Sequence, residues 1–429
     1  MKKNLWKKII AIIGICTLVA FPMVGCGGQE DKEIYLVNPF TGPDGDNFIA
    51  MVEEYNATDP EYPVRVVTMA GDAMYALINS AYAAGSGIPD LMIVHADFVS
   101  NYIADEMLVD WNQFIDVYPE ITASNYIESA WNIGQGPNGE RFSIPLDVHS
   151  WVLYYNIDLM EQYGVTHVMD DGILTFDEVR QVGEVVAAAG SDTVVYGITG
   201  GWLSFFSTYK QLGGTFTDDG INPTLYNDIS VQVMETFNGL YEAGFTNEHG
   251  EDPIQLFNTG QVMFLPEGVW YLNAANEIDN FEWGVTHTTQ MDPNNIVNFT
   301  GSHQFVMFNS DERSDDKAQG IASFVEWIRQ NSIEWARAGQ NPATLDILNS
   351  DEYRAMPQSF LMETEVGRNS LVIDDYFYGG FVSAEMWRIF DDMAFGNLDI
   401  REGLEGAQRG LEDRIAQDLL GITEDDEEE

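Results

Sequence analysis

The sequence predicts an α/β protein whose N-terminal part contains a mainly parallel sheet. The chain has 429 residues, of which 45% are hydrophobic and 21% charged, a composition typical of a globular protein with a large core. Between residues 33 and 94 the hydrophobic periodicity alternates between that of strands and that of helices. The length is enough for two or three domains, yet no internal repeat or long linker separates them.

The first five elements follow a β-α-β-α-β order, which is typical of a mainly parallel sheet. Residues 33–37 alternate as a strand, and the turn-rich segment 39–45 precedes a helix whose apolar residues recur from Phe48 to Tyr55. The next three elements are a strand over 64–69, a helix over 73–84 and a short buried strand over 91–94.

Later segments continue in the same style. Residues 151–155 are predicted to be an extended segment of a second lobe. Thr175 and Glu178 form a capping box, so a helix is expected to follow as far as Ala189. An apolar stripe over 404–415 predicts the last helix.

The charge balance excludes several classes of partner. Lys and Arg total 19 against 69 Asp and Glu. Four of the lysines lie in residues 1–8, so the chain without its leader has 15 basic residues and a net charge of −54. Such a chain repels phosphate backbones and anionic lipid headgroups, so we expect neither nucleic acid nor a lipid surface to bind it directly.

The N-terminus has the order of a secretion signal. Basic residues precede an apolar run that ends in Met23-Val24-Gly25-Cys26, and an uncleaved membrane anchor is the alternative. The last four residues resemble the lipobox of bacterial lipoproteins, in which the cysteine is acylated and becomes the first residue. We therefore expect a signal peptide over 1–25, lipidation of Cys26, and a flexible tether over 26–33.

The sequence contains no recognised catalytic motif in its required context. Gly134, Gly136 and Gly139 satisfy G-x-G-x-x-G, but Pro137 interrupts them and the strand and helix that a dinucleotide site needs are missing. A P-loop, a nucleophile elbow and an H-E-x-x-H motif are absent from the sequence. Paired carboxylates of a glycosidase would not stand out among 69 acids.

Aromatic residues beside turns are the most conspicuous feature that remains. Phe40, Trp151, Trp202 and Trp270 all lie in or next to such turns, where an indole can present its apolar face to a sugar while its N–H stays hydrogen-bonded. The alternative is that these residues anchor the core. Polar residues at predicted strand ends are candidates for binding hydroxyls, or else caps and surface groups: His95, Asp97, Asp147, His149 and His303.

Several motifs resemble, in order, the extracellular solute-binding proteins of carbohydrate ABC transporters, the family-one group that includes maltose-binding proteins. The likeness covers about residues 34–420. Its motifs are F-T-G-P-D-G, I-P-D-L-M-I-V-H-A-D, F-S-I-P-L, Y-Y-N-I-D-L-M, L-T-F-D-E-V, F-N-T-G-Q-V-M-F with G-V-W, G-S-H-Q-F-V-M-F, A-G-Q-N-P-A-T and G-N-L-D-I-R-E-G-L-E-G-A-Q.

The resemblance implies a type II periplasmic-binding-protein fold, in which two discontinuous α/β lobes are joined by hinge crossings. We expect these crossings near Asp147, Thr300 and Pro342. The predicted organisation is an N-terminal lobe over 34–147 plus 301–342, a C-terminal lobe over 148–300 plus 343–420, and an acidic tail over 421–429.

The resemblance also implies a binding site between the lobes and no enzymatic activity. We assign no metal ligands and expect no cofactor and no ATP, and the sequence leaves open whether a metal ion is bound. Thr344 stands where members of the family often have Arg, and the chain is unusually poor in Lys and rich in acids. The expected ligand contacts are Phe40, Asp44, His95, Asp97, Asp147, His149, Trp202, Trp270 and His303.

The function that the resemblance implies is capture of a sugar or oligosaccharide and its delivery to an ABC permease. We expect a monomer, held by its lipid anchor on the extracytoplasmic face of a bacterial cell membrane. Two other classes remain open from the sequence, a cell-surface glycosidase and a non-catalytic adhesin or scaffold lipoprotein.

Overall fold

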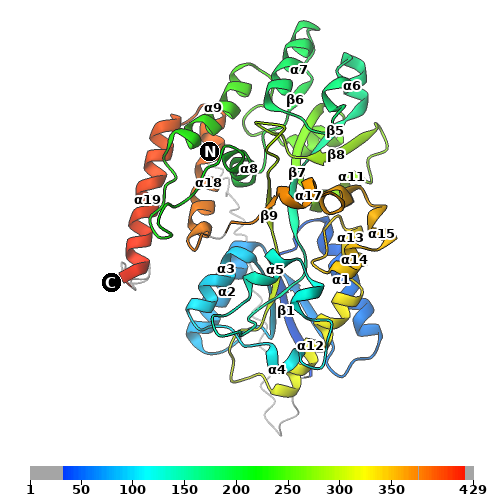
Figure 1. The fold of residues 1–429 in the computed structure, drawn as a ribbon, viewed down its shortest axis with the longest axis vertical. Coiled ribbons are helices and arrows are strands. Elements are labelled where there is room, and N and C mark those ends of the chain that lie inside the picture. Colours follow the sequence, from blue (N-terminus) through cyan, green and yellow to red (C-terminus); the bar gives the residue numbers. More distant parts are fainter. Residues whose placement is uncertain (1–31, 375, 421–429) are drawn as a thin grey trace, which may run out of the picture. The chain divides into compact units, whose positions relative to one another are not determined.

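The computed structural model describes residues 32–374 and 376–420. The predicted signal peptide, Cys26, nearly all of the tether and the acidic tail lie outside these residues. From Glu33 onward the chain forms one compact unit. Within it lie two sheets, one of five and one of six strands (Figure 1).

The first sheet has the order β2-β1-β3-β10-β4. Its first three strands are parallel, as predicted, whereas β10 runs antiparallel to both of its neighbours. The strands are β1 (Ile34–Asn38), β2 (Val64–Thr68), β3 (Leu91–His95), β4 (Ile144–Pro145) and β10 (His303–Val306). The helices of this lobe are α1 (Pro43–Ala57), α2 (Gly71–Ala84), α3 (Ala96–Ala104), α4 (Asn112–Ile115), η1 (Ala123–Asn125), α5 (Glu128–Ile133), α12 (Asp315–Gln330) and α13 (Ile333–Arg337).

The second sheet has the order β11-β9-β5-β7-β6, with β8 paired to β5. Its strands are β5 (His149–Asn156), β6 (Val194–Tyr196), β7 (Val262–Gly268), β8 (Trp283–His287), β9 (Asn298–Gly301) and β11 (Leu371–Val372). Its helices are α6 (Ile157–Tyr163), η2 (Thr166–Met169), α7 (Phe176–Ala188), α8 (Gly201–Gln211), α9 (Asp228–Glu242), α10 (Pro253–Asn258), η3 (Val269–Tyr271), α11 (Leu272–Ala275), α18 (Gly379–Ala394) and α19 (Ile400–Leu420). Short helices link the lobes, namely α14 (Leu345–Leu348), α15 (Asp351–Arg354), η4 (Pro357–Ser359), α16 (Phe360–Glu363) and α17 (Glu365–Ser370).

Each sheet is covered by apolar side chains on both faces. In β3, Leu91 and Ile93 belong to one hydrophobic core, while Met92 and Val94 belong to another on the opposite face. This follows from the alternation of side chains along a strand, and it explains why strands buried on both faces read as continuous apolar runs. The two-lobed α/β class that we predicted is confirmed.

The chain passes between the sheets at two short segments. β4 of the first sheet leads into β5 of the second through 146–148, and β9 leads into β10 through Ser302. A third segment, around residues 341–342, runs beside them. The Val148 N–H donates to the Asn341 carbonyl at 2.7 Å, and Asp147 and Pro342 form an isolated antiparallel β-bridge. The exact lobe boundaries that we drew remain a prediction.

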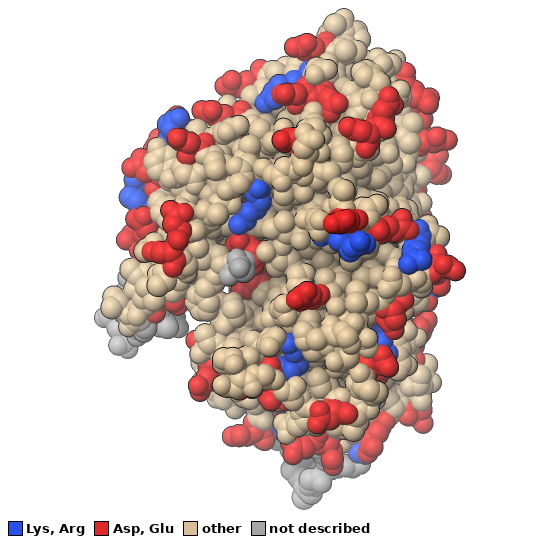
Figure 2. Space-filling model, viewed as in Figure 1, with Lys and Arg blue, Asp and Glu red and all other residues tan. Residues whose placement is uncertain are grey.

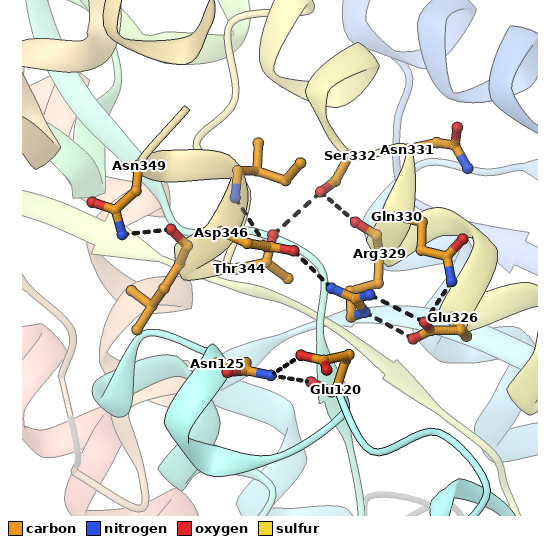
Figure 3. Close-up of polar contacts among 12 residues, drawn as sticks. Glu120, Asn125, Glu326, Arg329, Gln330, Asn331, Ser332, Thr344, Asp346 and Asn349 are labelled. Atoms are coloured by element: carbon orange, nitrogen blue, oxygen red, sulfur yellow. Dashed lines mark hydrogen bonds and ion pairs between the residues drawn. The ribbon is translucent and has the colours of Figure 1, made fainter. Parts of the chain in front are cut away.

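Polar contacts, some buried and some partly exposed, fix the third segment beside α12 (Figure 3). Arg329 pairs with Glu326 at 2.8 Å and with Asp346 at 3.0 Å, which ties α12 to the start of α14. The hydroxyls of Ser332 and Thr344 are 3.3 Å apart. Thr344 is buried, so it packs between the two segments.

The capping box predicted before α7 is confirmed. Glu178 N–H donates to the Thr175 hydroxyl at 3.3 Å, and Thr175 N–H donates to the Glu178 carboxylate at 2.8 Å. These two bonds satisfy N–H groups that the first turn of a helix otherwise leaves without partners.

Removing the cap tests its contribution to stability. Thr175→Ala should lower the free energy of unfolding by about 1 kcal/mol, because an N-cap hydroxyl is lost. Chemical denaturation of the purified protein measures this change. Thr166→Ala, at an exposed position of η2, is the control and should leave the midpoint unchanged; equal effects of the two changes would contradict the assignment.

Candidate functional site

Strand pairing brings three histidines from distant parts of the chain together. His303 on β10 lies opposite His95 on β3, and His149 on β5 lies opposite Gly301 on β9. The ring centroids of His149 and His303 are 4.2 Å apart, and those of His95 and His303 are 5.1 Å apart. We call His95, His149, His303 and the adjacent Asp147 the histidine cluster.

A glycine makes room for the cluster. A Cβ atom on Gly301 would lie 2.3 Å from His149 Nε2, closer than real Cβ atoms approach other atoms. A side chain at this position would push the imidazole away from its partners. Gly301 is therefore part of the packing that allows the two lobes to share one cluster.

The Asp147 carboxylate lies at the centre of the cluster and is fully buried. Its Oδ1 accepts a hydrogen bond from the backbone N–H of His303 at 3.0 Å and lies 3.2 Å from His149 Nδ1. Its Oδ2 lies 2.7 Å from His303 Nδ1 and accepts a hydrogen bond from Trp335 Nε1 at 2.8 Å. Both oxygens thus contact groups from several segments of the chain.

These contacts decide the charge state of the cluster. Burial alone would raise the pKa of Asp147, but attraction from His303 and hydrogen bonds from both imidazoles hold it far below its usual range. Burial and the adjacent His303 lower the pKa of His149. Burial also holds the pKa of His95 well below its usual range. The cluster therefore combines an ionised carboxylate with at least two imidazoles that favour the neutral form.

Aromatic rings border the cluster on two sides. The Phe40 ring lies 4.8 Å from His303, and the Trp270 ring lies 5.8 Å from His149. Trp270 folds back over Gly268, where a Cβ atom would lie 2.1 Å from the indole. Its side chain is hydrogen-bonded to Glu267, which is the arrangement expected of an indole that offers its face to a ligand.

Two further predicted residues lie near the cluster. Asp44 is buried in α1, where its carboxylate accepts a hydrogen bond from Gln340 at 3.0 Å and burial raises its pKa. Asp97 is exposed at the start of α3, yet the surrounding protein displaces enough water to raise its pKa to about 6. Asp374 of the second lobe adds repulsion, so Asp97 faces that lobe.

Trp202 does not join the cluster. Its side chain is 5% exposed and packs in the core of the second lobe against the rings of Phe205, Phe206 and Phe216. The next residue on the N-terminal side, Gly201, instead lines a hollow of about 360 Å³ together with Trp387 on α18. Trp202 therefore occupies the position of a core anchor, the alternative that the sequence left open.

Four residues of the site were not singled out from the sequence. Trp335 donates a hydrogen bond to Asp147, and Gln340 donates one to Asp44. Glu267 is hydrogen-bonded to Trp270. The Tyr75 hydroxyl lies 2.6 Å from His95 Nδ1. Gln340 lies inside the motif A-G-Q-N-P-A-T, and Trp335 precedes the turn at the start of that motif. The same association of Trp with a turn that indicated Trp270 could have found Trp335.

The chain is similar to known solute-binding proteins both in sequence and in structure. Residues 50–360 match the model of the bacterial extracellular solute-binding protein family. An arabinooligosaccharide-binding protein of Halalkalibacterium halodurans is 26% identical over 246 residues, which are 54% of this chain and 53% of that protein. The chain thus spans about half the length of this relative.

Two further similarities cover more of the chain. A maltooligosaccharide ABC transporter solute-binding lipoprotein of Streptococcus pneumoniae is 23% identical over 361 residues, which are 79% of this chain and 81% of that protein. The structure of an ABC substrate-binding protein from Listeria monocytogenes in complex with cycloalternan superposes with a TM-score of 0.75 at 17% identity. It covers 92% of this chain and 100% of that one.

Glu267 predicts a pH dependence of stability. Burial raises the pKa of this carboxyl to about 7 from 4.5, so between these values the unfolded chain ionises while the folded chain keeps the proton. Folding therefore loses stability as the pH rises through this window. Glu267→Gln removes this loss, and its advantage over the parent should grow by about 3 kcal/mol between pH 4.5 and pH 7.5.

Denaturation of both proteins across this pH range measures the difference. Glu161→Gln, at an exposed position of α6, is the control and should follow the parent at every pH. A Glu267→Gln curve parallel to that of the parent would contradict the assignment.

Proposed function

This chain belongs to the bacterial extracellular solute-binding protein family, and we propose that it holds a sugar or oligosaccharide between its two lobes. Family membership confirms the resemblance inferred from the motifs. The observation that carries the proposal is the convergence of both lobes on the histidine cluster beside Trp270. The relatives named for arabino- and maltooligosaccharides support the ligand class.

The chemistry of this region suits a carbohydrate. Sugars have apolar C–H faces that stack on an indole and hydroxyl rims that need both donors and acceptors. Trp270 supplies the flat face, and the imidazoles and Asp97 supply polar groups. Asp147 contacts the Nδ1 atoms of His149 and His303, and the Tyr75 hydroxyl contacts Nδ1 of His95. These contacts orient the three imidazoles before a ligand arrives.

Charge argues against a phosphorylated ligand. Asp97 and Asp374 repel each other across the two lobes, and so do Asp105 and Asp418. The nearby Lys210 is salt-bridged to Asp374 at 3.0 Å. On the visible face, acidic side chains are also more widespread than basic ones (Figure 2). A phosphate group would meet repulsion here, whereas a neutral sugar would not.

Transport then follows from closure of the lobes. A ligand that contacts both lobes favours the closed state by the difference between its affinities for the closed and open states. The closed monomer would dock on an ABC permease, whose separate ATPase subunits power import. The chain itself performs no catalysis in this account.

The glycosidase alternative is weaker. Its general acid would be a carboxyl that gives its proton to the leaving group. Asp147, at the centre of the cluster, is held ionised by its hydrogen bonds, but burial raises the pKa of Asp97 to about 6 and that of Glu267 to about 7. The protonation state of the carboxyls therefore does not decide against a glycosidase; the match to a solute-binding protein family argues against it. An adhesin would bind no small saccharide, which the melting experiment below distinguishes.

We also propose that Cys26 carries the lipid that holds the protein at the extracytoplasmic face of the cell membrane. The lipobox supports this, and the similar streptococcal protein is named a lipoprotein. Among residues 32–374 and 376–420, none of the helices has the length and apolar character needed to cross a bilayer.

Thermal melting with a panel of arabino- and maltooligosaccharides tests the ligand class. A saccharide present at about 100 times its Kd should stabilise the protein by about 2.7 kcal/mol and raise Tm. Trp270→Ala should weaken binding about tenfold or more and remove most of the shift, because a stacking face is lost.

Trp387→Ala is the matched control, because this tryptophan is 52% exposed and lines the separate hollow beside Gly201. It should keep the full shift. Loss of the shift in Trp387→Ala alone would place the ligand in that hollow, and a flat response to the whole panel would contradict the proposed function.

Cell fractionation with palmitate labelling tests the anchor. Cys26→Ser should lose the label and appear in the soluble fraction, since the thiol that carries the lipid is gone. Cys16→Ser, which changes the other of the two cysteines, should remain labelled and membrane-bound. A membrane-bound Cys26→Ser protein would contradict the proposal.

A further inference from the structure

Three side chains of the histidine cluster have the composition of a metal site. One ligand atom from each of Asp147, His149 and His303 lies within 4.8 Å of the other two. The side chains are 0%, 6% and 7% exposed. Two imidazoles and one carboxylate form a set that divalent transition metals such as Zn²⁺ and Fe²⁺ prefer in proteins.

The backbone places these ligands firmly. Asp147 lies in the segment between β4 and β5, His149 begins β5, and His303 begins β10. The Ser302 hydroxyl donates to the Asp147 carbonyl at 2.6 Å, which joins the two crossing segments. A metal here would connect the segments that pass from one lobe to the other.

Neighbouring groups orient the ligands from outside. Trp335 Nε1 and the backbone N–H of His303 donate to the Asp147 carboxylate at 2.8 and 3.0 Å. Carboxylates and histidines that bind metals are commonly held in this way by a second layer of hydrogen bonds. These two donors can remain bonded to the carboxylate when a metal ion binds its other lone pairs.

The contacts between the imidazoles and Asp147 are those of a site in which no metal is bound. The Nδ1 atoms of His149 and His303 lie 3.2 and 2.7 Å from the Asp147 oxygens, which fits imidazole N–H groups donating to the carboxylate. Two ligand atoms at about 2.0–2.1 Å from one Zn²⁺ ion lie about 3.3 Å apart in a tetrahedral site. To reach this spacing the two contacts would have to lengthen by about 0.1 and about 0.6 Å, and the three ligand atoms already lie within 4.8 Å of one another.

We propose that Asp147, His149 and His303 bind one divalent transition-metal ion of the Zn²⁺ class at the crossing of the lobes. This goes beyond sugar binding and does not depend on it. Imidazole ligands favour this class over Mg²⁺ and Ca²⁺, which prefer oxygen ligands. The acidic surface binds hard cations loosely, so the test must separate the two kinds of site.

Equilibrium dialysis against Zn²⁺ in the presence of excess Mg²⁺, after removal of metal with a chelator, provides that test. The purified protein should retain one Zn²⁺ per chain. His149→Ala combined with His303→Ala should weaken binding at least a hundredfold, because only one protein ligand remains. His167→Ala, at an exposed position of η2, should bind as the parent does. Equal retention by the parent and the double variant would overturn the proposal.

Absorption spectroscopy of the unaltered protein with Co²⁺ keeps the test independent of how the variants fold. One equivalent should produce intense visible bands typical of nitrogen ligands in a four- or five-coordinate site, and Zn²⁺ should remove them. The weak spectrum of hydrated Co²⁺ would overturn the proposal. Neither experiment includes a saccharide, so failure of the metal site and failure of the proposed function are distinguishable.

Discussion

The buried Asp147 carboxylate is the interaction on which the centre of this protein depends. It contacts two imidazoles, one indole and one backbone N–H, and these groups come from three segments that are distant in the sequence. A buried charge without such partners would cost several kcal/mol. The chain can bury this carboxylate only if all three segments meet beside it, so the charge fixes where the lobes join.

The same constraint arranges the surface that we propose binds the ligand. Because Asp147 holds His149 and His303 from behind, their rings lie close together beside Phe40 and Trp270. Glu267 does the same for Trp270. Polar and aromatic groups are therefore set before the ligand arrives, and binding need not pay the full entropy of ordering them. Under the proposed function, the carboxylates that face one another around this region would favour neutral over anionic ligands.

Local features of the fold were predictable from the sequence, and long-range ones were not. Strand and helix periodicity located β1 to β3, and hydrogen-bonding chemistry located the cap at Thr175, because these depend on residues within a few positions. The pairing of His95 with His303 depends on sheet register across more than 200 residues, which no local pattern encodes. Trp202 shows that a local pattern can also mislead. A Trp beside a glycine turn has the same local sequence whether its ring packs in the core, as here, or is offered to a ligand.

The central claim is that a saccharide contacts the histidine cluster, and imidazole NMR tests it most directly. The chain has only six histidines, so their ring resonances can be assigned by single substitutions. On titration with an oligosaccharide that raises Tm, the resonances of His95, His149 and His303 should shift together and saturate, while that of His167 stays in place. A saccharide that stabilises the protein and leaves these three resonances unmoved would contradict the account.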